Sequence, residues 1–309
     1  MQALNLITTL RNLKRYSKYA SVIPLNYLAH RGLVANFLLF ELVKNNNVDN
    51  FANILKDYLL NLPNGDIPRA IKEMLGIADE NKLPIELQVA KDKADAIEVS
   101  FLVMPERLAE VDPTFPKLNI TLDQLNSFEL NLSKYLTIVR FNNGDIPVNN
   151  KRISLAEHIA ETLILALIDD TGVVSKYIDS EAEFNRLLQI LAVHDLMELY
   201  TADIPTPIKV KMEAKVRELE YMVFVELERA NGQKELFEYL RQILNVNDTD
   251  RVIDEFGLMQ LERYGKLDRV RLIAKYFDIY SLYVEAITIG AENIANEAWN
   301  KMENILRRL

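Results

Sequence analysis

Histidine is scarce in this chain, and its positions suggest a metal site. The 309 residues include three histidines, His30, His158 and His194. Asp195 directly follows His194, and Glu198 lies four residues beyond that histidine. Imidazole nitrogens and carboxylate oxygens are the protein ligands of Mn, Co, Fe, Ni or Zn ions. We therefore predict that His158, His194 and Asp195 share one divalent cation.

A fourth ligand is expected downstream, and Asp278 is the best candidate. It lies in an apolar helical pattern over residues 273–287, where an unpaired carboxylate would be costly. The alternative is an ion pair between Asp278 and Lys275 or Arg271. Weaker candidates with polar neighbours are Asp250, Asp254 and Asp268.

The central motif follows an apolar run over residues 187–193, which predicts the end of a buried helix. If that helix covers 184–200, His194 and Glu198 share one face. Two prolines then hold Asp203 in a turn beyond the helix end. The simpler alternative is a capped helix with solvated acidic residues.

The elements that would position these residues all read as helices. Nine glycines and few alternating β-branched runs favour an all-α chain. Ser154 with Glu157 has the spacing of a capping box, so it marks a helix start. Predicted helices cover 4–19, 26–44, 50–62, 69–77, 84–104, 122–141, 155–168, 184–200, 212–230, 233–244, 267–289 and 291–308.

Composition narrows the class of protein. Hydrophobic residues make up 49% and charged residues 26%, which is ordinary for a globular chain. The net charge of -9 argues against a binder of duplex nucleic acid. The absence of cysteine excludes disulfides and thiolate ligands. Without a long apolar segment we expect no membrane span and a cytoplasmic location.

The two parts of the chain resemble each other in the order of their motifs, which predicts a degenerate internal repeat. The matching segments are Arg15-Tyr16 with Arg140-Phe141, Ile23-Pro24 with Ile146-Pro147, Leu28-Ala29-His30 with Leu155-Ala156-Glu157-His158, Lys56-Asp57 with His194-Asp195, and Lys93-Ala94-Asp95 with Tyr276-Phe277-Asp278. Recurrence of common Ile-Pro turns is the alternative. Lys56 has donors only and cannot bind a cation. We expect 1–116 to be a silent helical domain and 117–309 the active one, divided near the proline-containing segment 112–116.

The order His158, His194-Asp195, Asp278 resembles the H…HD…D signature of HD-domain metal-dependent phosphohydrolases. Over about 125–309 the chain is similar to bacterial 5'-deoxynucleotidases and their archaeal relatives. The narrower likeness is the run from Glu198 through Asp203-Ile204-Pro205-Thr206-Pro207 to Lys209. Ala202 replaces the family's usual glycine, and the interval from Asp195 to Asp278 is long for the family.

This resemblance implies a role for each residue. His158, His194, Asp195 and Asp278 would hold one divalent metal. Glu198 would orient or deprotonate the attacking water, and Asp203 would contact that water or a sugar hydroxyl. Arg140 would meet the phosphate and Phe141 would pack on the sugar or base. For Arg140, a plain ion pair is an equally good reading.

The expected activity is removal of the 5'-phosphate from a (deoxy)nucleoside monophosphate by metal-activated water. One alternative is an HD phosphohydrolase that acts on nucleoside triphosphates or another phosphoester. A different class is a non-enzymatic, nucleotide-sensing or structural helical protein. The partner would be a small nucleotide substrate. The two halves would form a pseudo-dimer, or the whole chain would form a homo-oligomer.

Overall fold

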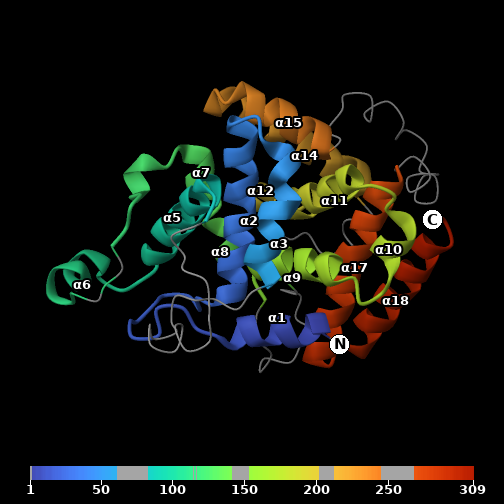
Figure 1. Ribbon diagram of the computed structural model, residues 1–309, viewed down its shortest axis with the longest axis horizontal. Helices are drawn as coiled ribbons and strands as arrows, with labels where there is room; N and C mark the ends of the chain where they lie inside the picture. Colours follow the sequence, from blue (N-terminus) through green and yellow to red (C-terminus); the bar gives the residue numbers. More distant parts are fainter. Residues whose placement is uncertain are drawn as a thin grey trace.

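The structure is a computed structural model that describes residues 2–60, 83–113, 115, 117–140, 153–201, 212–244 and 268–309. Within these residues the regular elements are all helices, joined by isolated β-bridges (Figure 1). The predicted all-α class is therefore confirmed. No helix of these ranges is long and apolar enough to cross a bilayer.

The helices before residue 117 are α1 (Gln2–Asn12), α2 (Tyr27–Lys44), the short η1 (Val48–Asn50), α3 (Phe51–Leu60), α5 (Ile85–Val99) and α6 (Pro105–Val111). Helices α1, α2, α3 and α5 match predicted segments with shifted ends, whereas η1 and α6 were not predicted. The helix predicted over 4–19 ends at Asn12, because the following residues pair with the segment before α2. The helix predicted over 69–77 lies outside the described residues.

The remaining helices carry most of the predicted site. They are η3 (Leu122–Gln124), α7 (Ser127–Asn131), α8 (Lys134–Thr137), α9 (Leu155–Ile168), α10 (Val173–Tyr177), α11 (Glu181–Val193), α12 (Glu198–Thr201), α14 (Glu213–Asn231), α15 (Lys234–Leu244), α17 (Arg269–Ile289) and α18 (Glu292–Leu306). The predicted capping box is present, since Ser154 and Glu157 bond to each other's backbone N–H at the start of α9.

Two of the predicted helices are wrong in their continuity. The helix predicted over 122–141 is instead three short elements, because Asn126 and Glu129 form a capping box that starts a new helix at Ser127. The helix predicted over 184–200 ends at Val193. Beyond it the backbone tightens, with the N–H of Leu196 bonded to the carbonyl of Val193 and that of Glu198 to Asp195.

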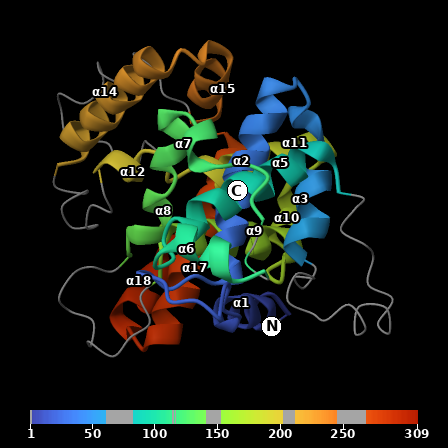
Figure 2. The ribbon, with the colours of Figure 1, turned by 90° about the vertical axis from the view of Figure 1, so that its left-hand side faces the viewer.

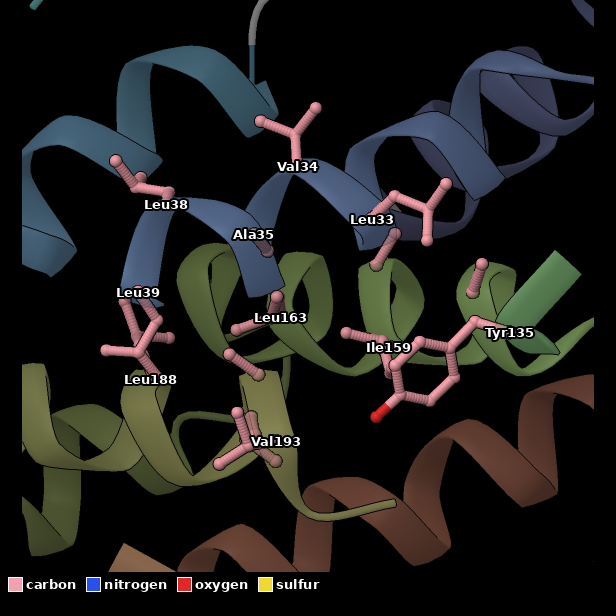
Figure 3. Close-up of a cluster of buried hydrophobic side chains, with 14 of the residues drawn as sticks. Leu33, Val34, Ala35, Leu38, Leu39, Tyr135, Ile159, Leu163, Leu188 and Val193 are labelled. Atoms are coloured by element: carbon pink, nitrogen blue, oxygen red, sulfur yellow. The ribbon is translucent and has the colours of Figure 1, made fainter. Parts of the chain in front are cut away.

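Helices α2, α9 and α11 form the centre of the molecule. Helices α5 to α7 lie on one side of them and α17 and α18 on the other (Figure 1). At the two ends, α14 and α15 lie opposite α1 (Figure 2). The shared core between α2, α9 and α11 is drawn in Figure 3, where Leu39, Leu163 and Leu188 belong to one buried cluster. Burial of such apolar surface drives the packing of these helices.

Helices α2 and α9 cross at very short range at Gly32. A Cβ added at Gly32 would lie 1.9 Å from the carbonyl oxygen of Ala156. Only a residue without a side chain permits this approach. The crossing places α9, the helix that carries His158, directly against α2. One hydrophobic cluster includes residues from both sides of residue 116, and the division into two domains stays a prediction.

Candidate metal centre

Three of the four predicted ligands converge on one point. The Nε2 atom of His158 lies 3.2 Å from Nε2 of His194 and 3.2 Å from Oδ1 of Asp278. The Nε2 atom of His194 is 3.7 Å from the same Asp278 oxygen. The ligand atoms of this triplet all lie within 4.8 Å of one another. They come from α9, the end of α11 and α17, which pack together.

Asp195 borders the same point. Its Oδ2 is 3.5 Å from Nε2 of His158, and its Oδ1 is 3.4 Å from Nε2 of His194. The Oδ2 atom is buried without a hydrogen-bond partner. A buried, unsatisfied carboxylate oxygen is costly unless a cation or donor meets it. The four residues therefore fit a divalent cation by both ligand type and position.

The outer nitrogens of both imidazoles are bound to acceptors. Nδ1 of His158 is 3.0 Å from Oγ of Ser281 and 3.2 Å from Oε1 of Glu285. Nδ1 of His194 is 2.8 Å from the carbonyl oxygen of Leu191. A carbonyl or carboxylate can only accept, so each Nδ1 carries the hydrogen. In a neutral ring this leaves the Nε2 lone pair available for a metal ion.

The charges around the centre favour a bound cation. Burial and Arg140 lower the pKa of His158, but hydrogen bonds to Asp278 and Glu285 outweigh them and raise it to about 9. Burial lowers the pKa of His194. Burial opposes ionisation of Asp278, yet Lys275 and His158 hold its pKa well below the usual value. The carboxylate is thus ionised at neutral pH and favours any nearby positive charge.

The predicted alternative for Asp278, an ion pair with Lys275, is present but involves only one of the two carboxylate oxygens. Lys275 Nζ lies 2.6 Å from Oδ2, which leaves Oδ1 facing the histidines. The other predicted partner, Arg271, binds Asp268 instead. Asp268 itself caps the start of α17 and is no part of the centre. Asp250 and Asp254 lie outside the described residues.

Arg140 is held by carboxylates of the chain itself. A backbone bridge between Val139 and Ser154 fixes the segment before α9. The guanidinium then lies 3.3 Å from Oε2 of Glu285 and 3.8 Å from Oδ2 of Asp195. Its side chain is 14% exposed. These contacts are those of the ion-pair reading, and the predicted phosphate contact stays a prediction.

Glu198 lies at the start of α12, after the tightened turn, and is partly buried. Its charge acts on Arg140 and on the buried phenol of Tyr135. The tyrosine ring lies beside Ile159 in Figure 3. Glu198 therefore lies on a separate short helix, α12, and not on the continuous helix over 184–200 that the sequence predicted. Asp203 and Phe141, the other predicted site residues, lie outside the described residues.

Sequence reasoning missed Glu285, the fully buried partner of His158 and Arg140. A detectable signal was present. Glu285 follows Asp278 by seven residues on the same apolar helix, so the two share a face. The burial argument that selected Asp278 applies to Glu285 equally well.

A second cluster of the same kind lies in the first part of the chain. His30 on α2 faces two carboxylates of α5, with its Nδ1 3.1 Å from Oε2 of Glu98 and 3.9 Å from Oδ1 of Asp95. Arg15 binds both acids, with Nε 2.8 Å from Glu98. Ligand atoms of His30, Asp95 and Glu98 also lie within 4.8 Å of one another.

The surroundings of the two clusters correspond. Each histidine lies four residues after a helix N-cap, Asn26 or Ser154. The segment that precedes each cap forms an antiparallel bridge one residue before the arginine, at Lys14 or Val139. The correspondence stops at Lys56 and Asp57, which are exposed on α3. The internal repeat stays a prediction supported by these parallels.

Comparison with known proteins adds one match. Residues 147–255 match a family model described as HD domain. No curated protein and no solved structure matched the chain. The matched segment includes His158, His194 and Asp195, while Asp278 and Glu285 lie beyond its end. HD domains are typically metal-dependent phosphohydrolases that bind divalent metals, and the match supports that general class.

Proposed function

We propose that His158, His194, Asp195 and Asp278 bind one divalent metal ion and that the chain is a phosphohydrolase. The observation that carries this proposal is the meeting of two imidazole Nε2 atoms and Asp278 Oδ1 within 4.8 Å. The Oδ2 atom of Asp195 has no hydrogen-bond partner, although the Arg140 guanidinium lies 3.8 Å away, and this supports a ligand at the same point. Two imidazoles and two carboxylates suit Mn, Co, Fe, Ni or Zn.

When bound, the metal would lower the pKa of a water molecule and polarise a phosphoryl oxygen. Glu198 would accept the proton of that water; its support is its place three residues after Asp195 and its electrostatic effect on Arg140. Glu285 would keep the hydrogen of His158 on Nδ1, so that Nε2 stays a ligand. Arg140 would neutralise Glu285 and Asp195 and add positive charge beside the phosphate.

The substrate class we propose is a nucleoside 5'-monophosphate, with a preference for deoxynucleotides. Its support is the run from Glu198 to Lys209, which resembles that of 5'-deoxynucleotidases and lies inside the segment matched to HD domains. The proposed roles of Asp203 and Phe141, at the water or sugar and at the base, belong to the same resemblance.

The test is a phosphatase screen of the purified chain. Nucleoside mono- and triphosphates and a model phosphate ester are incubated with the protein and with each of Mn²⁺, Co²⁺, Fe²⁺, Ni²⁺ and Zn²⁺. Release of inorganic phosphate from monophosphates supports the proposal. Release of pyrophosphate or triphosphate from a triphosphate would replace the substrate class and keep the reaction class.

Absence of hydrolysis of every ester by a metal-loaded sample would overturn the enzymatic proposal. Metal stripping then defines what remains. A structural ion should lower the Tm strongly on removal, whereas an open catalytic ion should mainly cost activity. A nucleotide that binds without turnover would indicate a sensing protein.

A further inference from the structure

The group formed by His30, Asp95 and Glu98, called the first-half cluster below, consists of residue types that bind metal ions and surrounds the side chain of Arg15. Two of its members are buried, with His30 2% exposed and Glu98 0% exposed, and the side chain of Asp95 is 29% exposed. Arg15 extends from the segment before α2 and binds Asp95 and Glu98 at once. The same guanidinium lies over the rings of Tyr16 and Tyr27, 5.0 Å from each centroid. Two carboxylates and two aromatic faces therefore stabilise the positive charge of Arg15.

The corresponding arginine in the second half takes a different position. Arg140 binds Glu285 and Asp195, while Oδ1 of Asp278 faces the two imidazoles. In the first half Asp95, the predicted counterpart of Asp278, is bound by Arg15 itself. The guanidinium therefore stands where the second half offers its acidic oxygen to a metal ion.

We propose that Arg15 supplies, as a side chain, the cation of a first-half site built from His30, Asp95 and Glu98. The native chain then holds no metal ion at this site, because a guanidinium and a divalent cation would repel each other among the same acids. Removing the guanidinium turns the three ligands into a second metal site. The comparison with the second half rests on the proposed function of that half, but the first-half ligands and Arg15 are observed independently.

The chemistry of His30 is compatible with both states. Burial and the neighbouring Arg15 lower the pKa of His30 well below its usual value, so the ring is neutral. With Arg15 present, Nδ1 carries a hydrogen and donates to Glu98. Without Arg15, moving that hydrogen to Nε2 gives Nδ1 a free lone pair toward the acids. The buried Oε1 of Glu98 has no hydrogen-bond partner, so this oxygen could also bind a metal ion.

The experiment counts Mn²⁺ ions per chain by titration calorimetry and elemental analysis of the full-length protein. We expect one ion for the native chain, two for Arg15→Met and one for the double variant Arg15→Met with His30→Ala. Arg11→Met is the matched control, because Arg11 is also a buried arginine between two carboxylates, Glu157 and Glu161. Neither described metal-type group includes those two acids, so this variant should stay at one ion.

A count of one for Arg15→Met would overturn the proposal. If that variant unfolds without metal, Mn²⁺ should restore its folding and raise its Tm more than that of the double variant. Failure of Mn²⁺ to restore folding contradicts the proposal, because the ion would then not replace the guanidinium.

A second measurement does not depend on the folding of Arg15→Met. Asp278→Asn in an otherwise native chain should hold no Mn²⁺, and an ion that persists there until His30→Ala removes it would also overturn the proposal. A native chain without metal that gains one ion in Arg15→Met would reject the proposed second-half centre and keep this inference.

Discussion

Each part of the chain buries a histidine four residues after a helix N-cap, but the two rings use different nitrogens. His30 turns Nδ1 toward its acids, whereas His158 turns Nε2 toward Asp278 and binds Glu285 through Nδ1. His158 has a second imidazole, that of His194, at 3.2 Å. The first-half cluster has Arg15 among its acids. The comparison teaches that two clusters with similar helix starts differ in what lies among their acids, which is an arginine in one and a second imidazole in the other.

The largest expected effect is that of Asp278→Asn. This change removes a ligand charge while keeping the size of the side chain, so bound metal and hydrolysis should both fall to background. The matched change Asp95→Asn in the first half should leave the metal content and turnover as they are. Elemental analysis and a phosphate-release assay check both variants. Equal losses in the two variants would contradict the assignment of chemistry to the second half.

Glu198→Gln should slow turnover by ~10²–10⁴-fold, the usual contribution of a general base. The metal content should not change, because Glu198 is outside the ligand set. Glu181→Gln, an exposed substitution on the first turn of α11, serves as the control and should have no effect. Loss of metal from Glu198→Gln would make Glu198 a ligand and alter the proposed mechanism.

Stability should depend on pH through Glu98. Burial raises the pKa of this carboxyl to about 7, although Arg15 opposes the rise. A raised folded-state pKa means that the folded state binds the proton more tightly. The stabilisation is full below the unfolded value near 4.5 and is lost as the pH rises through 7. Its upper limit is ~3 kcal/mol at 1.36 kcal/mol for each pKa unit.

Urea unfolding of metal-free protein at pH 5 and pH 8 measures this dependence. Glu98→Gln should lose the part that belongs to Glu98. Glu161, whose pKa burial also raises to about 7, keeps its own part in both proteins. The same pH dependence in native and variant chains would show that Glu98 stays ionised in the folded state.

The smallest expected effect concerns Glu285→Gln. Its amide can turn an acceptor toward His158 but loses the charge that stabilises the ring, so metal affinity should fall by ~10–100-fold. Glu98→Gln should leave metal affinity unchanged and is the matched control. Competition titration with a chelator measures the affinity, and the ratio of kcat to KM reports whether the substrate step changes separately. An unchanged affinity would limit Glu285 to neutralising Arg140.

The sequence was sufficient to predict the helices whose signals are local. The capping box at Ser154 and the apolar pattern around Asp278 identified α9 and α17. Ligand types and order also identified the three groups that converge. The break before Ser127 was not predicted, although Asn126 and Glu129 have the same local spacing as Ser154 and Glu157, because the apolar pattern continues across it.

Ion pairs between residues that are far apart in the chain could not be predicted from the sequence. For Arg140 the sequence left a phosphate contact and an ion pair equally open, and only the fold reveals Glu285 and Asp195 beside it. Similarly, Arg15 and Asp95 are 80 residues apart in the chain. The sequence aligned each with a second-half residue but held no sign that they bind each other. Side-chain partners of this kind follow from helix packing, which residue spacing does not encode.

The close contact that glycine permits at position 32 has a consequence for expressing parts of this protein. Helix α2 touches the backbone of α9 two residues before His158. The first part of the chain therefore packs directly against the helix that carries a predicted metal ligand. The second part of the chain would therefore need the first part for folding whether or not the first part has chemistry of its own. A fragment that starts at residue 117 would bare the apolar flank of α9, so it should aggregate or seek a substitute for α2.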